Sequence, residues 1–145
     1  MVRVMNTRMF LALFLLGFAT NAPAIFEDEL PPTPDEAHGF LGGTFQRYAV
    51  AYAGNNGRAA RATAYGGDGC ISELASGRQK RAVTVDWSAV SEVAQLEGNA
   101  VDLRGAGAHG NVRLYFPNER AARSSAHAFE VLRAACEPPA LTARY

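Results

Sequence analysis

The chain has 145 residues, with 14 Lys and Arg against 14 Asp and Glu, so its formal net charge is zero. Arg3 and Arg8 are two of those cations, which leaves residues 25–145 with 12 basic and 14 acidic side chains and a net charge near −2. This balance argues against nucleic-acid binding, which requires a basic face. It also argues against an electrostatic hold on anionic lipid. The length suits one compact domain.

The first two dozen residues have the three parts of a secretory signal peptide. Arg3 and Arg8 precede an apolar run over residues 9–18, and Ala22-Pro23-Ala24 is a small-residue cleavage site. The run is shorter than the roughly 20 residues that span a bilayer, although a retained anchor is the alternative. We therefore predict a signal peptide over residues 1–24 and a soluble, periplasmic or secreted protein with no transmembrane segment.

An acidic, proline-containing arm is predicted over residues 25–33, and a helix begins directly after it. Thr33 can cap this helix, Pro34 suits its first position, and Glu36 completes a capping box. We expect the helix to cover most of residues 34–52, and a break near Gly43 is the alternative because glycine is a weak helix former. Residues 44–53 also alternate, so a strand is the alternative there.

Period-two alternation and frequent turns predict short strands from residue 58 onward. The turns fall at residues 66–69, 76–77, 98–99 and 105–110, and the expected strands are residues 60–65, 70–74, 81–87, 91–96, 100–103 and 112–116. Such spacing predicts an antiparallel sheet or open barrel of five to seven strands.

A second helix is predicted from about residue 117 to the pair Pro138-Pro139. Its apolar stripe includes Phe129, Leu132 and Cys136, so the sulfur points toward the sheet, where Cys70 begins a strand. Two cysteines in an exported chain most often pair. Closing a 66-residue loop would stabilise the fold by roughly 4 kcal/mol.

The class is therefore α+β: a single domain over residues 34–137 whose second helix plugs the sheet, with one disulfide and a tail over 138–145. The expected core comprises Phe45, Tyr48, Ile71, Val83, Val85, Val93, Val101, Leu103, Leu114, Phe116, Phe129 and Leu132, with Trp87 at its edge.

This order of elements resembles small exported bacterial domains of the pleckstrin-homology-like fold. The likeness covers about residues 34–137 and is carried by Gly69-Cys70-Ile71-Ser72, Val83-Thr84-Val85-Asp86-Trp87, Val101-Asp102-Leu103 and residues 122–136. Most such domains have no assigned function, so the resemblance implies architecture. Lipid-binding members carry clustered basic residues on the first strand pair, where this chain offers only Arg58 and Arg61.

No motif in the chain is specific for catalysis or for a cofactor. His38, His109 and His127 are isolated and lack metal-ligand spacing. Asp86 and Asp102 lie on expected strands, where solvent-facing acids are common. We expect no metal and no cofactor.

We predict a non-catalytic domain that binds a protein or small ligand in the cell envelope. The candidate interaction patch is Arg78, Lys80, Arg81 and Trp87, since the three cations form the one positive cluster. One alternative is a small hydrolase that uses Asp86 or His127. Another is a binder of lipid at a membrane surface.

Overall fold

The computed structural model describes residues 31, 33–53, 59–76, 79–106 and 110–140. The predicted leader, residues 1–24, lies outside them. The described elements are α1 (Pro34–Tyr48), β1 (Val50–Ala53), β2 (Ala59–Ala62), β3 (Ala64–Asp68), β4 (Ile71–Ser76), β5 (Gln79–Asp86), β6 (Glu92–Gln95), β7 (Ala100–Arg104), β8 (Val112–Tyr115) and α2 (Glu119–Cys136). This order confirms the α+β class.

The described strands number eight and form two antiparallel sheets, where an antiparallel sheet or open barrel of five to seven strands was expected. One sheet has the order β2-β1-β8-β7-β6 and the other β3-β4-β5. The chain passes between them at Thr63, whose N–H donates to the carbonyl of Ala75 at 3.0 Å. The single strand expected over residues 60–65 is therefore two strands, β2 and β3, which this corner separates.

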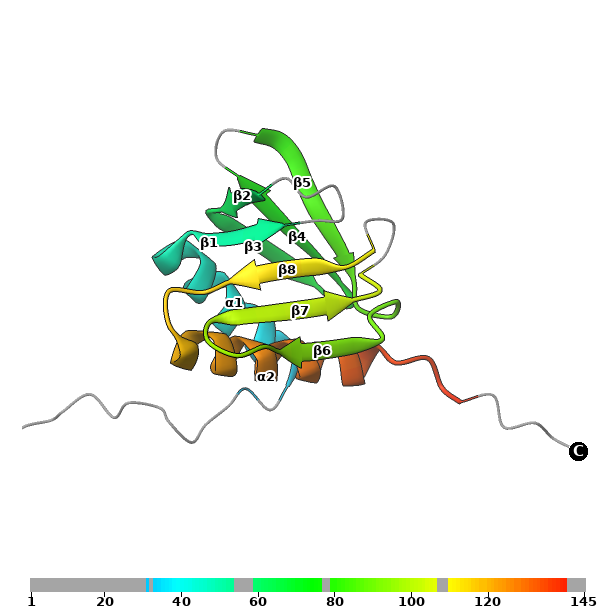
Figure 1. The fold of residues 1–145 in the computed structure, drawn as a ribbon. Helices are drawn as coiled ribbons and strands as arrows, with labels where there is room; N and C mark the ends of the chain where they lie inside the picture. The colour runs from blue at the N-terminus through cyan, green and yellow to red at the C-terminus, as the bar shows by residue number, and fades with distance from the viewer. Residues whose placement is uncertain (1–30, 32, 54–58, 77–78, 107–109, 141–145) are drawn as a thin grey trace, which may run out of the picture.

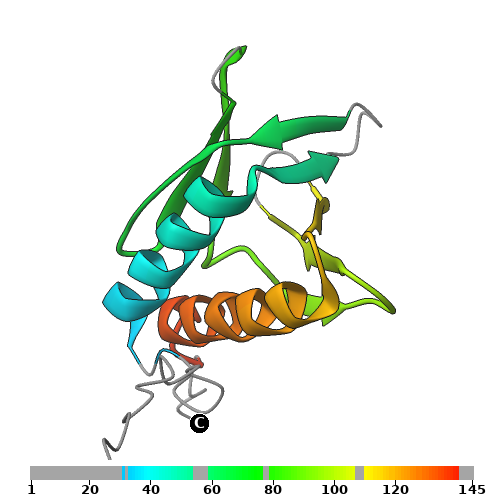
Figure 2. The ribbon, with the colours of Figure 1, turned by 90° about the vertical axis from the view of Figure 1, so that its left-hand side faces the viewer.

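Two helices close the space between the sheets (Figures 1 and 2). Helix α1 packs against β3 and α2, and α2 packs against β6 and β7. The N-cap of α1 is confirmed: the Thr33 hydroxyl accepts from the Glu36 N–H and donates to the Glu36 carboxylate at 2.9 Å. No helix among the described residues is long and apolar enough to cross a membrane.

Helix α1 differs from the expectation at its end. It runs unbroken past Gly43 because Leu41 and Phe45 bury one face completely, and this packing outweighs the weak helix propensity of glycine. It stops at Tyr48, where Ala49 adopts the left-handed conformation with φ 47°. Val50 to Ala53 then pair with β2 and β8, so the strand alternative was correct for these four residues.

The predicted turn at residues 66–69 is shifted. Gly66 and Gly67 belong to β3, paired with Glu73 and Ser72, and the turn follows at Gly69 with φ 56°. Glycine is required at position 67 for a steric reason, because a Cβ there would overlap the ring of His38.

The core lies between the sheets and the helices and contains a chain of aromatic rings. Phe116 contacts Phe45 and Phe129, and Trp87 stacks on Phe129 with ring centroids 5.4 Å apart. Ten of the twelve expected core residues are buried or pack against the core. Tyr48 and Ile71 were assigned wrongly, since they are 39% and 43% exposed.

Candidate functional site

The predicted interaction patch does not form as expected. Trp87 is 1% exposed and is the largest fully buried side chain, so its indole lies in the core rather than at its edge. Its burial follows from the alternation of β5, which continues the inward positions of Val83 and Val85. Arg78 lies outside the described residues. Lys80 and Arg81 lie on β5, but their side chains are outside the described part.

The Cys70–Cys136 disulfide is present. It joins the turn before β4 to the last residue of α2, with the two Cα atoms 5.6 Å apart. Because Leu132 and Cys136 are both buried, the bond holds the final turn of α2 against the three-stranded sheet. The sequence argument from the helix stripe therefore placed the sulfur correctly.

A chain of hydrogen bonds crosses the interior and was not predicted. Trp87 Nε1 donates to Ser72 Oγ at 2.7 Å, and this oxygen lies 2.8 Å from the Tyr65 hydroxyl. The Tyr65 hydroxyl lies 2.7 Å from Nδ1 of His38, whose Nε2 lies 2.8 Å from the carbonyl of Gly69. The chain thus links α1 to β3, to β4 and to Trp87, the residue directly after β5.

The partners fix the direction of each bond when His38 is neutral. A carbonyl only accepts, so Nε2 carries the proton and Nδ1 accepts from Tyr65. The Tyr65 oxygen then accepts from Ser72, which accepts from Trp87. All four bonds run in one direction, an arrangement in which each bond polarises the next. Burial is the main cause that raises the pKa of Tyr65, while the hydrogen bond with Ser72 lowers it, and the net change is upward.

The residues considered for catalysis serve separate local contacts. Asp86 accepts from the N–H and hydroxyl of Ser88 at 3.0 and 2.6 Å, and Asp102 pairs with Arg113. His127 is exposed on α2, and His109 lies outside the described residues. Across the described ranges, no hydrogen bond joins two of these candidates or joins one to His38. In the same ranges, no group of three His, Cys, Asp or Glu side chains has the arrangement of a metal site.

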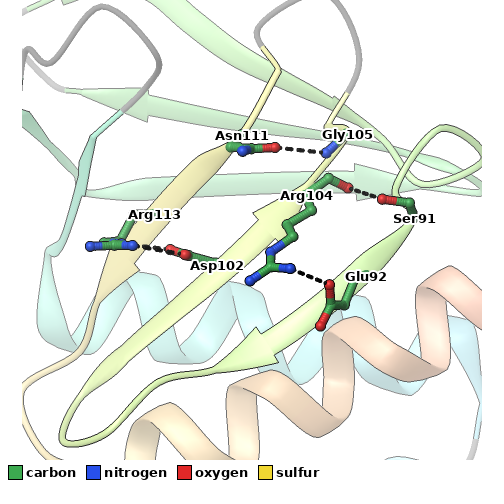
Figure 3. Close-up of polar contacts among 7 residues, drawn as sticks. All are labelled: Ser91, Glu92, Asp102, Arg104, Gly105, Asn111 and Arg113. Atoms are coloured by element: carbon green, nitrogen blue, oxygen red, sulfur yellow. Dashed lines mark hydrogen bonds and ion pairs between the residues drawn. The ribbon is translucent and has the colours of Figure 1, made fainter.

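The outer face of the five-stranded sheet carries an ordered set of charged side chains (Figure 3). Arg104 pairs with Glu92 at 2.7 Å. Arg113 forms two bonds with Asp102, at 2.6 and 2.9 Å. The figure shows these groups on the side of the sheet that faces away from both helices.

Tyr115 lies on this same face and is 40% exposed. Its register partners are Ala51 on β1 and Ala100 on β7, and Arg61 follows beyond Ala51. The two alanines leave the tyrosine ring unsupported by larger side chains in its row. Asp102 first, and then the Tyr115 hydroxyl, raise the pKa of Arg113 through side-chain hydrogen bonds.

We call this surface the Tyr115 face. It consists of Ala51, Arg61, Glu92, Ala100, Asp102, Arg104, Arg113 and Tyr115. Alternation in the sequence places the Tyr115 side chain on the face of the strand opposite to Leu114 and Phe116. The alanines beside it could be found only once the order of the strands was known.

The end of β7 is shaped by a glycine. Gly105 has φ 73°, and a Cβ there would lie 2.9 Å from the carbonyl oxygen of Ala89. The Asn111 side chain accepts from the Gly105 N–H at 3.1 Å, and the Ser91 hydroxyl donates to the Arg104 carbonyl at 3.3 Å. These contacts hold Arg104 and Glu92 at the margin of the Tyr115 face (Figure 3).

Comparison with known proteins shows a similarity of fold alone. No protein-family model matches the chain, and no curated protein matches its sequence. Among solved structures, the chain is similar to Inner Membrane Complex Sub-compartment Protein 3 (ISP3) from Toxoplasma gondii, with a TM-score of 0.52 and 10% identity. The match covers 72% of this chain and 88% of that one.

Proposed function

We propose that this chain is an exported, disulfide-linked domain that binds a partner protein of the cell envelope through the Tyr115 face. The role is non-catalytic. The leader pattern of residues 1–24 supports export, and the Cys70–Cys136 bond suits an oxidising compartment. The likeness to pleckstrin-homology-like domains enters this proposal as a likeness of architecture.

The exposed Tyr115 ring between two alanines is the observation that carries the proposal. Tyrosine and arginine are enriched where protein interfaces concentrate their binding energy. Arg61 lies in the Tyr115 row beyond Ala51, Arg113 lies in the adjacent row on β8, and Asp102 holds the guanidinium of Arg113 in place. An open sheet face suits contact with the surface of a protein better than enclosure of a small molecule.

Photocrosslinking tests the binding surface. A photoreactive phenylalanine analogue at Tyr115 should crosslink one partner in the native host, and the same analogue at Tyr48 should not. Tyr48 is the matched control because it is a tyrosine of nearly equal exposure, 39% against 40%, on α1. Arg61→Ala should weaken the Tyr115 crosslink several-fold. Equal products at both positions, or none at Tyr115, would refute this surface.

Mass spectrometry of the protein made from the full sequence tests export separately. The expected product begins at Ile25 and has a mass two hydrogens below that of the free-thiol form. An uncleaved leader or two free thiols would contradict export, whatever the crosslinking result.

A further inference from the structure

Strand β5 has an unpaired backbone edge. It spans Gln79–Asp86 and pairs with β4 in regular register over residues 83–86, and a register shift separates these from the pair of Gln79 with Ser76. Within the described ranges, no strand pairs with its other side, and β5 lies at the margin of the three-stranded sheet (Figure 1). A long edge strand is a template for pairing with another extended segment.

The register shows which backbone groups face outward. The Trp87 N–H donates to the Cys70 carbonyl at 2.9 Å, which makes this pair a hydrogen-bonded one. Hydrogen-bonded pairs alternate along an antiparallel ladder, so Val85 and Val83 also bond to β4. The N–H and carbonyl of Thr84 therefore point away from β4, toward the free edge.

The outer face beside this edge is acidic around an apolar centre. Ile71 on β4 is 43% exposed, and its register partners are Asp68 on one side and Asp86 on the other. Glu73 follows on the same face, beside Thr84. No ion pair joins these three carboxylates to a cation among the described side chains. They form an acidic cluster around an apolar side chain beside the regularly paired part of β5, whereas Lys80 and Arg81 lie in the shifted segment of that strand.

The inner side of the edge is apolar. Val83 is half-buried and packs against the core, next to the fully buried Val85. A strand added to β5 would place alternate side chains on these two sides. Those on the outer side would meet Asp86 and the charge around Ile71, and those on the inner side would meet Val83.

We propose that β5 binds an extended segment of a partner protein by strand addition, and that the segment alternates basic and apolar residues. Backbone bonds to Thr84 supply affinity, while Asp86 on β5, with Glu73 behind it on β4, selects lysine or arginine on the outer side. A polyamine would satisfy the carboxylates but would leave the backbone edge and Val83 without partners. A second copy would set two acidic faces side by side. This surface is separate from the Tyr115 face.

Fluorescence anisotropy with synthetic peptides tests the proposal. The probe is a labelled nine-residue peptide of alternating lysine and valine, added to the protein with its disulfide intact. A peptide of alternating lysine and glycine, with equal charge, should bind at least tenfold more weakly. Absent binding of the lysine–valine peptide, or equal affinity for both peptides, would refute strand addition.

Variants separate the backbone contribution from the charge. Thr84→Pro removes the outward N–H without breaking a bond to β4, and it should abolish binding. Glu73→Gln with Asp86→Asn should weaken binding about tenfold, whereas Glu119→Gln, which neutralises an exposed carboxylate on α2, should leave it unchanged. The fluorescence of Trp87 reports whether each variant is folded.

Four results would overturn the proposal. The first is that folded Thr84→Pro binds the lysine–valine peptide as tightly as the wild type, and the second is that Glu119→Gln weakens binding as much as the double carboxylate variant does. The third is that Tyr115→Ala abolishes peptide binding. The fourth is that the protein self-associates without peptide and that Thr84→Pro removes this self-association. The last would assign the edge to a second copy. Because Tyr115→Ala should leave peptide binding intact, failure here is distinguishable from failure of the Tyr115 face.

Discussion

Ser72 is the central link of the buried hydrogen-bond chain, and replacing it by alanine tests whether that chain stabilises the fold. Ser72 is fully buried, and its hydroxyl accepts from Trp87 and donates to Tyr65. Ser72→Ala leaves the buried indole N–H without a partner, at a cost of about 1–3 kcal/mol, and removes one further hydrogen bond worth about 1 kcal/mol. We expect a loss of about 3 kcal/mol in the free energy of unfolding.

Urea unfolding measures this loss, because the chain has one tryptophan and it lies in the hydrogen-bond chain itself. Far-ultraviolet circular dichroism should give the same midpoint if unfolding is two-state. Ser88→Ala is the control, since this serine bonds Asp86 on the surface and should cost less than 1 kcal/mol. A Ser72→Ala loss no greater than that of Ser88→Ala would refute the stabilising role.

The exposed glycines of α1, the phenol of Tyr65 and the disulfide each give a further expectation. Gly39→Ala and Gly43→Ala should each raise the free energy of unfolding by about 1 kcal/mol, because an added Cβ meets nothing within 4 Å; a lower thermal midpoint would contradict this. Burial raises the pKa of Tyr65 above its ordinary value of 10.0, so the neutral phenol stabilises the folded state fully at pH values well below 10. This stabilisation is lost as the pH rises through 10 and the phenol ionises in the unfolded state. Urea titrations should show a loss of about 1.4 kcal/mol between pH 9 and 11; an equal loss in Tyr65→Phe would contradict this origin. Reduction of the disulfide should lower the free energy of unfolding by roughly 4 kcal/mol, and the same reductant should leave a Cys70→Ser, Cys136→Ser variant unaffected. An unchanged urea midpoint of the reduced wild-type protein would contradict this expectation.

The sequence predicted those parts of the fold that depend on local chemistry. Thr33, Pro34 and Glu36 define the start of α1 because capping involves residues within one helical turn. The stripe of α2 placed Cys136 correctly because helical periodicity is fixed. The end of α1 was not predictable in this way, because Ala49 adopts its left-handed conformation only where β1 must pair with β8.

The division into two sheets depends on contacts that no local pattern contains. Gly66 and Gly67 are typical turn residues, yet they pair with β4 in β3, and His38, from a helix distant in sequence, occupies the space that a side chain at position 67 would need. The corner at Thr63 is likewise set by the pairing of β3 with β4. Tertiary packing overrides the local preference of these residues.

The surface proposed for strand addition escaped sequence analysis for a reason that lies in β4. An isoleucine followed by a serine predicts that Ile71 is inside and Ser72 outside, but the structure has the reverse. Ser72 is inside because Trp87 and Tyr65 supply its hydrogen bonds, and strand alternation then forces Ile71 outward. A buried polar chain thus produces an exposed apolar residue on the opposite face. Ile71 and the acids around it therefore follow from the interior of the protein, and a change at Ser72 that restores the usual alternation should alter the outer face of β4 as well.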